Sequence, residues 1–115
     1  MKVNVYHAQR NHITGDVESQ EHVAVVNMPS SITEKDEALE YAFRWTQNIM
    51  GSWSRNDIED NSDHNPLFVE RVAPLHEDGM GLRSSMMGDQ FVIENELGNR
   101  SLHEVAMMGF KDLVA

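Results

Sequence analysis

The chain has 115 residues, a formal net charge of -10 and no cysteine. This length is typical of one domain, and 40% hydrophobic residues suffice for one core, so we expect residues 1–115 to form a single domain. The absence of cysteine excludes disulfides, a thiolate nucleophile and zinc sites of the cysteine type. The apolar runs are far shorter than the roughly 20 residues of a membrane-spanning helix, and no signal-peptide pattern is present, so we expect a cytoplasmic protein.

The negative charge limits the classes of molecule that the chain is expected to bind. A chain with this charge repels phosphate backbones and anionic lipid headgroups, so direct nucleic-acid binding is disfavoured and no membrane contact is expected. Solubility alone explains the charge. As an alternative, an acidic face would dock on the basic nucleic-acid channel of another protein and mimic the polyanion.

Residues 3–8 and 22–28 have the pattern of two β-strands. In the first, Val3 and Val5 alternate with polar or aromatic neighbours, and the second is a β-branched run that stops before Pro29. Gly, Asn and Asp residues that favour turns lie between them. The sequence therefore predicts an N-terminal β-hairpin.

A single amphipathic helix is predicted after the hairpin. Ser31 to Glu34 fits the capping-box pattern, in which a hydroxyl binds a free backbone N–H and the carboxylate reaches back to the cap. Mostly apolar residues then recur every three or four positions until Gly51, which is expected to end the helix. These residues are Leu39, Ala42, Phe43, Thr46, Ile49 and Met50. One face of the helix is therefore expected to pack on a sheet.

The rest of the chain alternates loops with short strands. A polar loop is predicted over 51–66 and a strand over 67–73. Strand-like residues at 90–93 and 102–107 flank a turn at 97–99, which predicts a second hairpin. The expected fold is α+β, with an N-terminal β-hairpin, one helix and then three short strands in a mainly antiparallel sheet.

Several short segments carry a resemblance. They are residues 38–48, Ser-Trp-Ser at 52–54, Arg-Ser-Ser-Met-Met-Gly-Asp at 83–89, and Gly109 with Phe110. This pattern resembles that of short phage- and plasmid-encoded proteins with no established activity. The resemblance implies an origin on a phage or mobile element and a compact α+β fold, and it assigns no catalytic or binding residue.

The acidic loop contains part of a calcium-binding pattern. Asp57, Glu59, Asn61 and Asp63 place side-chain oxygens at every second position, but Ser62 stands where an EF-hand loop needs glycine. We therefore expect a solvated acidic loop, and neither a metal nor another cofactor.

The six histidines suggest a different kind of site. None has the helical spacing of a metal-binding pair, but His7 and His22 would face each other across the predicted hairpin. With His103 or Asp63 they would form a metal or acid/base cluster, whereas scattered surface histidines are the simpler interpretation. Such a cluster would make the chain a small enzyme, which requires a pocket holding His, Asp or Glu.

The turn after residue 82 and the methionines bear on partner binding. Arg83 and the serines after it suit an anion, but they match no phosphate-binding motif, and turn formation explains them. Adjacent methionines, as at 86–87 and 107–108, cannot both point to one face of a strand, which predicts exposed apolar side chains. The residues expected to contact a partner are Asp57, Glu59, Asp60, Asp63, Trp53, Arg83, Ser84, Ser85, Met86 and Met87.

These features favour a non-enzymatic protein-interaction module. It would bind another protein through its acidic helix-and-loop side or through an exposed Met and Trp patch, and self-association as a homodimer is a further option. The alternatives are a nucleic-acid mimic that inhibits a host DNA-binding or defence enzyme, and a small enzyme.

Overall fold

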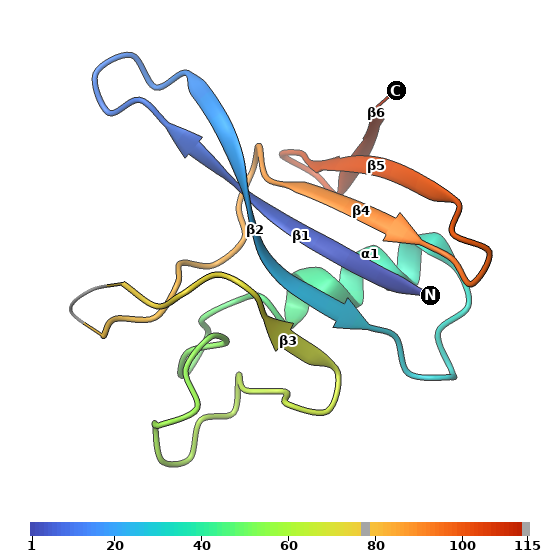
Figure 1. Ribbon diagram of the computed structural model, residues 1–115, viewed down its shortest axis with the longest axis horizontal. Coiled ribbons are helices and arrows are strands. Elements are labelled where there is room, and N and C mark those ends of the chain that lie inside the picture. Colours follow the sequence, from blue (N-terminus) through green and yellow to red (C-terminus); the bar gives the residue numbers. More distant parts are fainter. Residues whose placement is uncertain (77–78, 114–115) are drawn as a thin grey trace.

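The computed structural model describes residues 1–76 and 79–113 and contains one helix and six strands within them (Figure 1). The elements are β1 (Lys2–Arg10), β2 (Val17–Asn27), α1 (Lys35–Arg44), β3 (Val69–Arg71), β4 (Gln90–Glu94), β5 (Arg100–Val105) and β6 (Phe110–Leu113). All strands belong to one antiparallel sheet in the order β3-β2-β1-β4-β5-β6. The α+β class and the N-terminal hairpin are confirmed.

The core lies against one face of the central strands. Val5 of β1 pairs in register with Ala24 of β2 and Phe91 of β4, and all three side chains are fully buried. Val3 lies two residues earlier on the same face, as the period of a strand requires, and is also fully buried. The predicted strand alternation therefore identified the core face of β1.

Helix α1 covers only the middle of this face. It packs against β1 and β4 and buries Ala38, Leu39 and Ala42. The small alanines let its backbone approach the sheet closely. Figure 1 shows the helix behind the central strands, while β5 and β6 extend beyond it. Among the described residues, no helix therefore covers the face of these last two strands.

The predicted limits of the helix are wrong at both ends. The N-cap is Glu34, whose side chain makes no capping hydrogen bond, so the predicted capping box does not form. The helix ends at Arg44, and the Thr46 hydroxyl donates to the Ala42 carbonyl at 2.8 Å. Beyond it, the N–H groups of residues 49–51 bind the Asp63 carboxylate instead of helix carbonyls. Side-chain acceptors distant in sequence thus replace the last turns of the predicted helix.

The strands after α1 also differ from the prediction. Strand β3 has three residues, fewer than the predicted strand over 67–73, whereas β4 and β5 form the predicted hairpin. Four strands follow the helix instead of three, because the chain turns at 106–109 and adds β6. The Ala106 N–H donates to the Gly109 carbonyl at 2.9 Å, and Gly109 has φ 71°, a conformation that favours glycine.

Candidate functional site

A buried polar cluster lies where β1 meets the loop before β4. His7 Nε2 and the Thr46 hydroxyl lie 3.0 and 2.7 Å from the Ser85 hydroxyl. Arg83 donates to both carboxylate oxygens of Asp89, at 2.7 and 2.8 Å, and His7 Nε2 lies 3.8 Å from Asp89 Oδ2. These residues come from separate segments of the chain, which the cluster holds together.

The electrostatics of this cluster keep His7 neutral and Asp89 ionised. Burial lowers the pKa of His7 to about 4; the charge of Asp89 opposes this shift and that of Arg83 adds to it. Burial by itself raises the pKa of Asp89. Hydrogen bonds from Arg83 and from the N–H groups of Ala8 and Met86 outweigh it and hold that pKa below its ordinary value. The ion pair is therefore present at neutral pH.

The cluster has the residue types of an acid/base site but not the accessibility. His7, Ser85 and Asp89 are at most 3% exposed. None of them lines either of the two cavities described below. A substrate needs a concave pocket that presents such groups, so this arrangement fits a structural anchor better than a catalytic site.

Asp63 is a second buried anchor. Its Oδ2 accepts the N–H groups of Ile49, Met50 and Gly51 at 2.8, 2.8 and 2.6 Å, and Arg44 lies 3.2 Å from Oδ1. Burial raises the pKa of this carboxyl, but the N–H groups and the guanidinium outweigh burial and hold the pKa below its ordinary value. Asp63 thus fixes the path of the chain after α1.

Side chains of the calcium-like pattern make contacts with other groups of the protein. Asn61 Oδ1 accepts the N–H of Ser52, and its amide donates to the carbonyls of Ser52 and Arg55. Asp57 binds Arg55 through two hydrogen bonds of 2.9 Å. Within residues 1–76 and 79–113, no group of three or more His, Cys, Asp or Glu side chains is placed to hold a metal ion.

His7 and His22 do not converge as the enzyme hypothesis requires, and His103 instead binds Ser101 at 2.8 Å and Asp112 at 2.7 Å. His22 pairs in register with Tyr6, and their rings stack at 4.7 Å. His7 instead meets the edge of Trp53 at 6.2 Å. Residues 6 and 7 are neighbours on one strand, so their side chains point to opposite faces of the sheet. The predicted pairing of His7 with His22 is therefore wrong.

The expected partner-binding residues divide into an exposed group and a buried group. Asp57, Glu59, Asp60, Met86 and Met87 are exposed, and Arg83 and Ser84 are partly exposed. Asp63, Trp53 and Ser85 are at most 3% exposed. The Trp53 indole donates to the Arg83 carbonyl at 2.9 Å and so fastens the loop after α1 to the loop before β4. The three buried side chains belong to the interior and are not presented to a partner.

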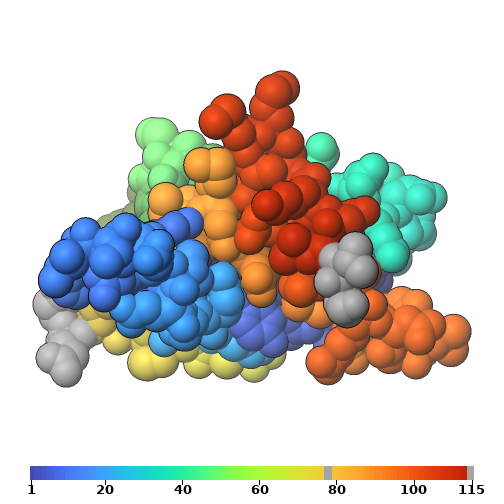
Figure 2. Space-filling view, turned by 90° about the horizontal axis from the view of Figure 1, so that it is seen from above, coloured from blue at the N-terminus to red at the C-terminus, as the bar shows by residue number. Residues whose placement is uncertain are grey.

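The larger cavity is an open groove of about 640 Å³ between α1 and the β5–β6 hairpin, here called the α1–β6 groove. Leu39 and Phe43 line it from the helix, and Val105 and Phe110 line it from the strands. The rings of Phe43 and Phe110 meet edge to face at 6.1 Å. Figure 2 shows the red C-terminal strands projecting beside the teal segment at the start of α1.

Exposed apolar side chains extend the α1–β6 groove to the surface. Ile49 and Met107 line it and are 60% and 86% exposed. Their exposure follows from local structure: the binding of residues 49–51 to Asp63 takes Ile49 out of the helix, and the turn between β5 and β6 carries Met107. The predicted helix stripe and methionine pairs contained these residues, but strand β6, which forms one wall, was missed.

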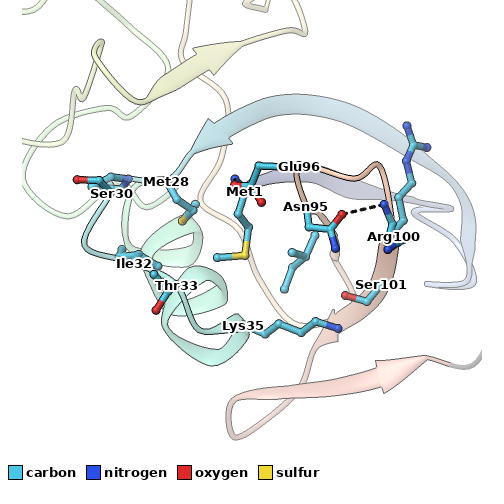
Figure 3. A pocket seen from close by; sticks show the side chains of 13 residues that line it. Met1, Met28, Ser30, Ile32, Thr33, Lys35, Asn95, Glu96, Arg100 and Ser101 are labelled. Atoms are coloured by element: carbon cyan, nitrogen blue, oxygen red, sulfur yellow. Dashed lines mark hydrogen bonds and ion pairs between the residues drawn. The ribbon is translucent and has the colours of Figure 1, made fainter.

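A second cavity, of about 420 Å³, lies between the start of α1 and the β4–β5 turn (Figure 3). Met28 and Ile32 line it together with the polar side chains of Lys35, Asn95 and Ser101. Two of its three positive charges are paired: the N-terminal ammonium binds Glu96 at 2.6 Å, and Arg100 lies 3.5 Å from Glu94, which is outside the lining. The third positive charge in the lining is Lys35.

Comparison with known proteins gives no relative: no family model, curated protein or solved structure matches this chain. Of the helices in residues 1–76 and 79–113, none has the length and apolar character needed to cross a membrane.

Proposed function

We propose that the chain is a non-enzymatic protein-interaction module that holds an apolar segment of a partner protein in the α1–β6 groove. The observation that carries the proposal is the continuity between the apolar floor of the groove and the exposed side chains of Ile49 and Met107. Large apolar side chains gathered at an open groove are typical of binding surfaces. The proposed origin on a phage or mobile element rests on the resemblance of residues 38–48 and 83–89.

The two alternatives have less support. Mimicry of nucleic acid needs free acidic groups on one face, but Asp57 is engaged by Arg55 and Asp63 is buried. An enzyme needs its titratable groups in a pocket, but the His7 and Asp89 cluster is buried outside both cavities. The α1–β6 groove does hold Asp36, Glu40 and Asp112, but these side chains lie on its exposed rim, and its floor is apolar.

The test is a selection of short random peptides on the immobilised chain. We expect enriched peptides that bind the wild type and lose binding to the double variant Ile49→Gln and Met107→Gln. Both side chains are exposed, so the substitutions change the groove surface without removing core contacts.

The matched control is Ile13→Gln with Met108→Gln. These residues are of the same types and are 89% and 90% exposed, but they do not line the groove. The control is expected to bind the selected peptides like the wild type. Absence of enrichment, or equal binding to all three proteins, would contradict the proposal.

A further inference from the structure

The incomplete helical layer indicates the shape of the occupant. Strands are about 4.8 Å apart and a helix with its side chains is about 10 Å wide, so one helix covers roughly two strands. Helix α1 packs against β1 and β4, and in the part of the chain that the structure describes no other helix covers the adjoining faces of β5 and β6. A second helix beside α1 would complete the layer and place its apolar side chains in the α1–β6 groove.

The rim of the groove indicates the charge of the occupant. Asp36 and Glu40 are exposed on the helix side, and Asp112 on β6 is also exposed but binds His103 at 2.7 Å. Among the described residues that line the groove, Arg44 is the only basic one; it is held by the buried carboxylate of Asp63 and stacks over the Trp45 ring at 4.2 Å. The rim therefore carries net negative charge, which attracts Lys and Arg side chains.

The same charges argue against a second copy of the chain as the occupant. A twofold dimer through this groove would bring the acidic rim of one copy next to that of the other. Each copy also carries a net charge of -10, so their approach is repulsive. The acidic rim therefore attracts a basic partner, whereas it repels a second copy of the chain.

We infer that the α1–β6 groove binds a basic amphipathic helix of another protein, with apolar side chains on the groove floor and Lys or Arg against Asp36 and Glu40. This inference rests on the proposed function and adds the shape and charge of the partner. Anionic lipid and nucleic acid are disfavoured occupants, because the acidic rim repels phosphate.

The experiment uses three designed helical peptides with leucines at i, i+3, i+4 and i+7, which form one apolar face. The other positions are all lysine in the first peptide, all glutamine in the second and all glutamate in the third, here called the Lys, Gln and Glu peptides. Binding to the whole chain is measured by fluorescence anisotropy at low and moderate salt. We expect the Lys peptide to bind most tightly and the Glu peptide most weakly, with the difference shrinking as salt increases.

The variant Asp36→Asn with Glu40→Gln tests the rim. It is expected to weaken binding of the Lys peptide about fivefold, as the loss of two exposed ion pairs implies, and to leave the Gln peptide unchanged. The matched control Glu59→Gln with Asp60→Asn removes the same charge from the acidic loop, outside the groove lining, and is expected to leave Lys-peptide binding near wild type.

The outcomes separate the inference from the function on which it rests. If the Lys and Gln peptides bind equally, and Ile49→Gln with Met107→Gln abolishes both, the groove function stands and the basic partner is overturned. If both charge variants weaken the Lys peptide equally, the attraction is general and the rim is not a recognition site. If Ile49→Gln with Met107→Gln changes the binding of none of the three peptides, the proposed function itself fails.

Discussion

Arg83 and Asp89 form a two-point ion pair, with Nη1 2.7 Å from Oδ2 and Nη2 2.8 Å from Oδ1. The same guanidinium donates to the Ala8 carbonyl at 3.1 Å, and the Ala8 N–H donates to Asp89 at 2.8 Å. The pair thus binds both backbone groups of one residue in β1. It fastens the loop before β4 to the N-terminal hairpin.

Replacing Asp89 with Asn removes the charge that compensates Arg83 but leaves a side chain of nearly the same size. Asp89 is fully buried, and its two oxygens each accept a backbone N–H, from Ala8 and Met86, so an Asn amide leaves one of these donors without an acceptor and also leaves the partly exposed Arg83 without its charged partner. We expect a loss of about 3 kcal/mol in the free energy of unfolding, measured by urea denaturation. Asp57→Asn, which alters the exposed pair with Arg55, is the control and is expected to keep the wild-type midpoint. Equal midpoints for both variants would show that the buried pair is not an anchor.

Stability is expected to depend on pH through His7. Its pKa is about 4 in the folded chain and 6.5 when unperturbed, mainly because burial disfavours the charged ring. Between these values the unfolded chain binds a proton that the folded chain does not. The contribution of His7 to the free energy of unfolding is therefore fully present above pH 6.5, and about 3 kcal/mol of it is lost as the pH falls to 4.

The carboxylates extend this loss at lower pH. Their pKa values are held below 3.8 in the folded chain, so Asp63 and Asp89 contribute stability above that pH and lose it as the pH falls through their folded values. Urea denaturation from pH 7 to 4 isolates the histidine. His7→Gln should flatten the profile in this range, whereas the exposed His12→Gln should keep its slope. An unchanged slope in His7→Gln would contradict the assignment.

Removing the Asp63 carboxylate should release the segment after α1. Asp63→Ala leaves three backbone N–H groups without their acceptor, and we expect a loss of about 3 kcal/mol in the free energy of unfolding. Hydrogen exchange should accelerate at the amides of Ile49, Met50 and Gly51 in particular. Asp57→Ala, in the same acidic loop, is the control. Wild-type exchange rates at all three amides of the Asp63 variant would disprove the anchoring role.

The strands with strong alternation could be predicted from the sequence, and the limits of the helix could not. The pattern around Val3 and Val5 depends on neighbouring residues alone, so the first hairpin was identified correctly. The end of α1 depends on Asp63, which lies far along the chain and competes for the N–H groups of residues 49–51. A helical stripe gives no sign of a distant acceptor.

The candidate site was only partly predictable for the same reason. Strand alternation predicted that at least one of Met107 and Met108 is exposed. Both are exposed, because they lie in the turn between β5 and β6 and not on a strand. Strand β6 was missed because Phe110–Leu113 is short and mixes Phe and Leu with Lys and Asp. Trp53 and Asp63 looked like surface residues in a polar loop, and their buried hydrogen bonds depend on tertiary contacts.

The two edge strands have a consequence for behaviour at high concentration. An exposed edge offers unpaired backbone groups to strands of other molecules, and short or charged edges discourage this addition. Strand β3 consists of Val69, Glu70 and Arg71, and β6 has Lys111 and Asp112 at its centre. Neither edge offers the long uncharged stretch that seeds amyloid-like stacking. The molecule thus keeps apolar side chains exposed at the α1–β6 groove while its short, charged edge strands disfavour growth into fibrils.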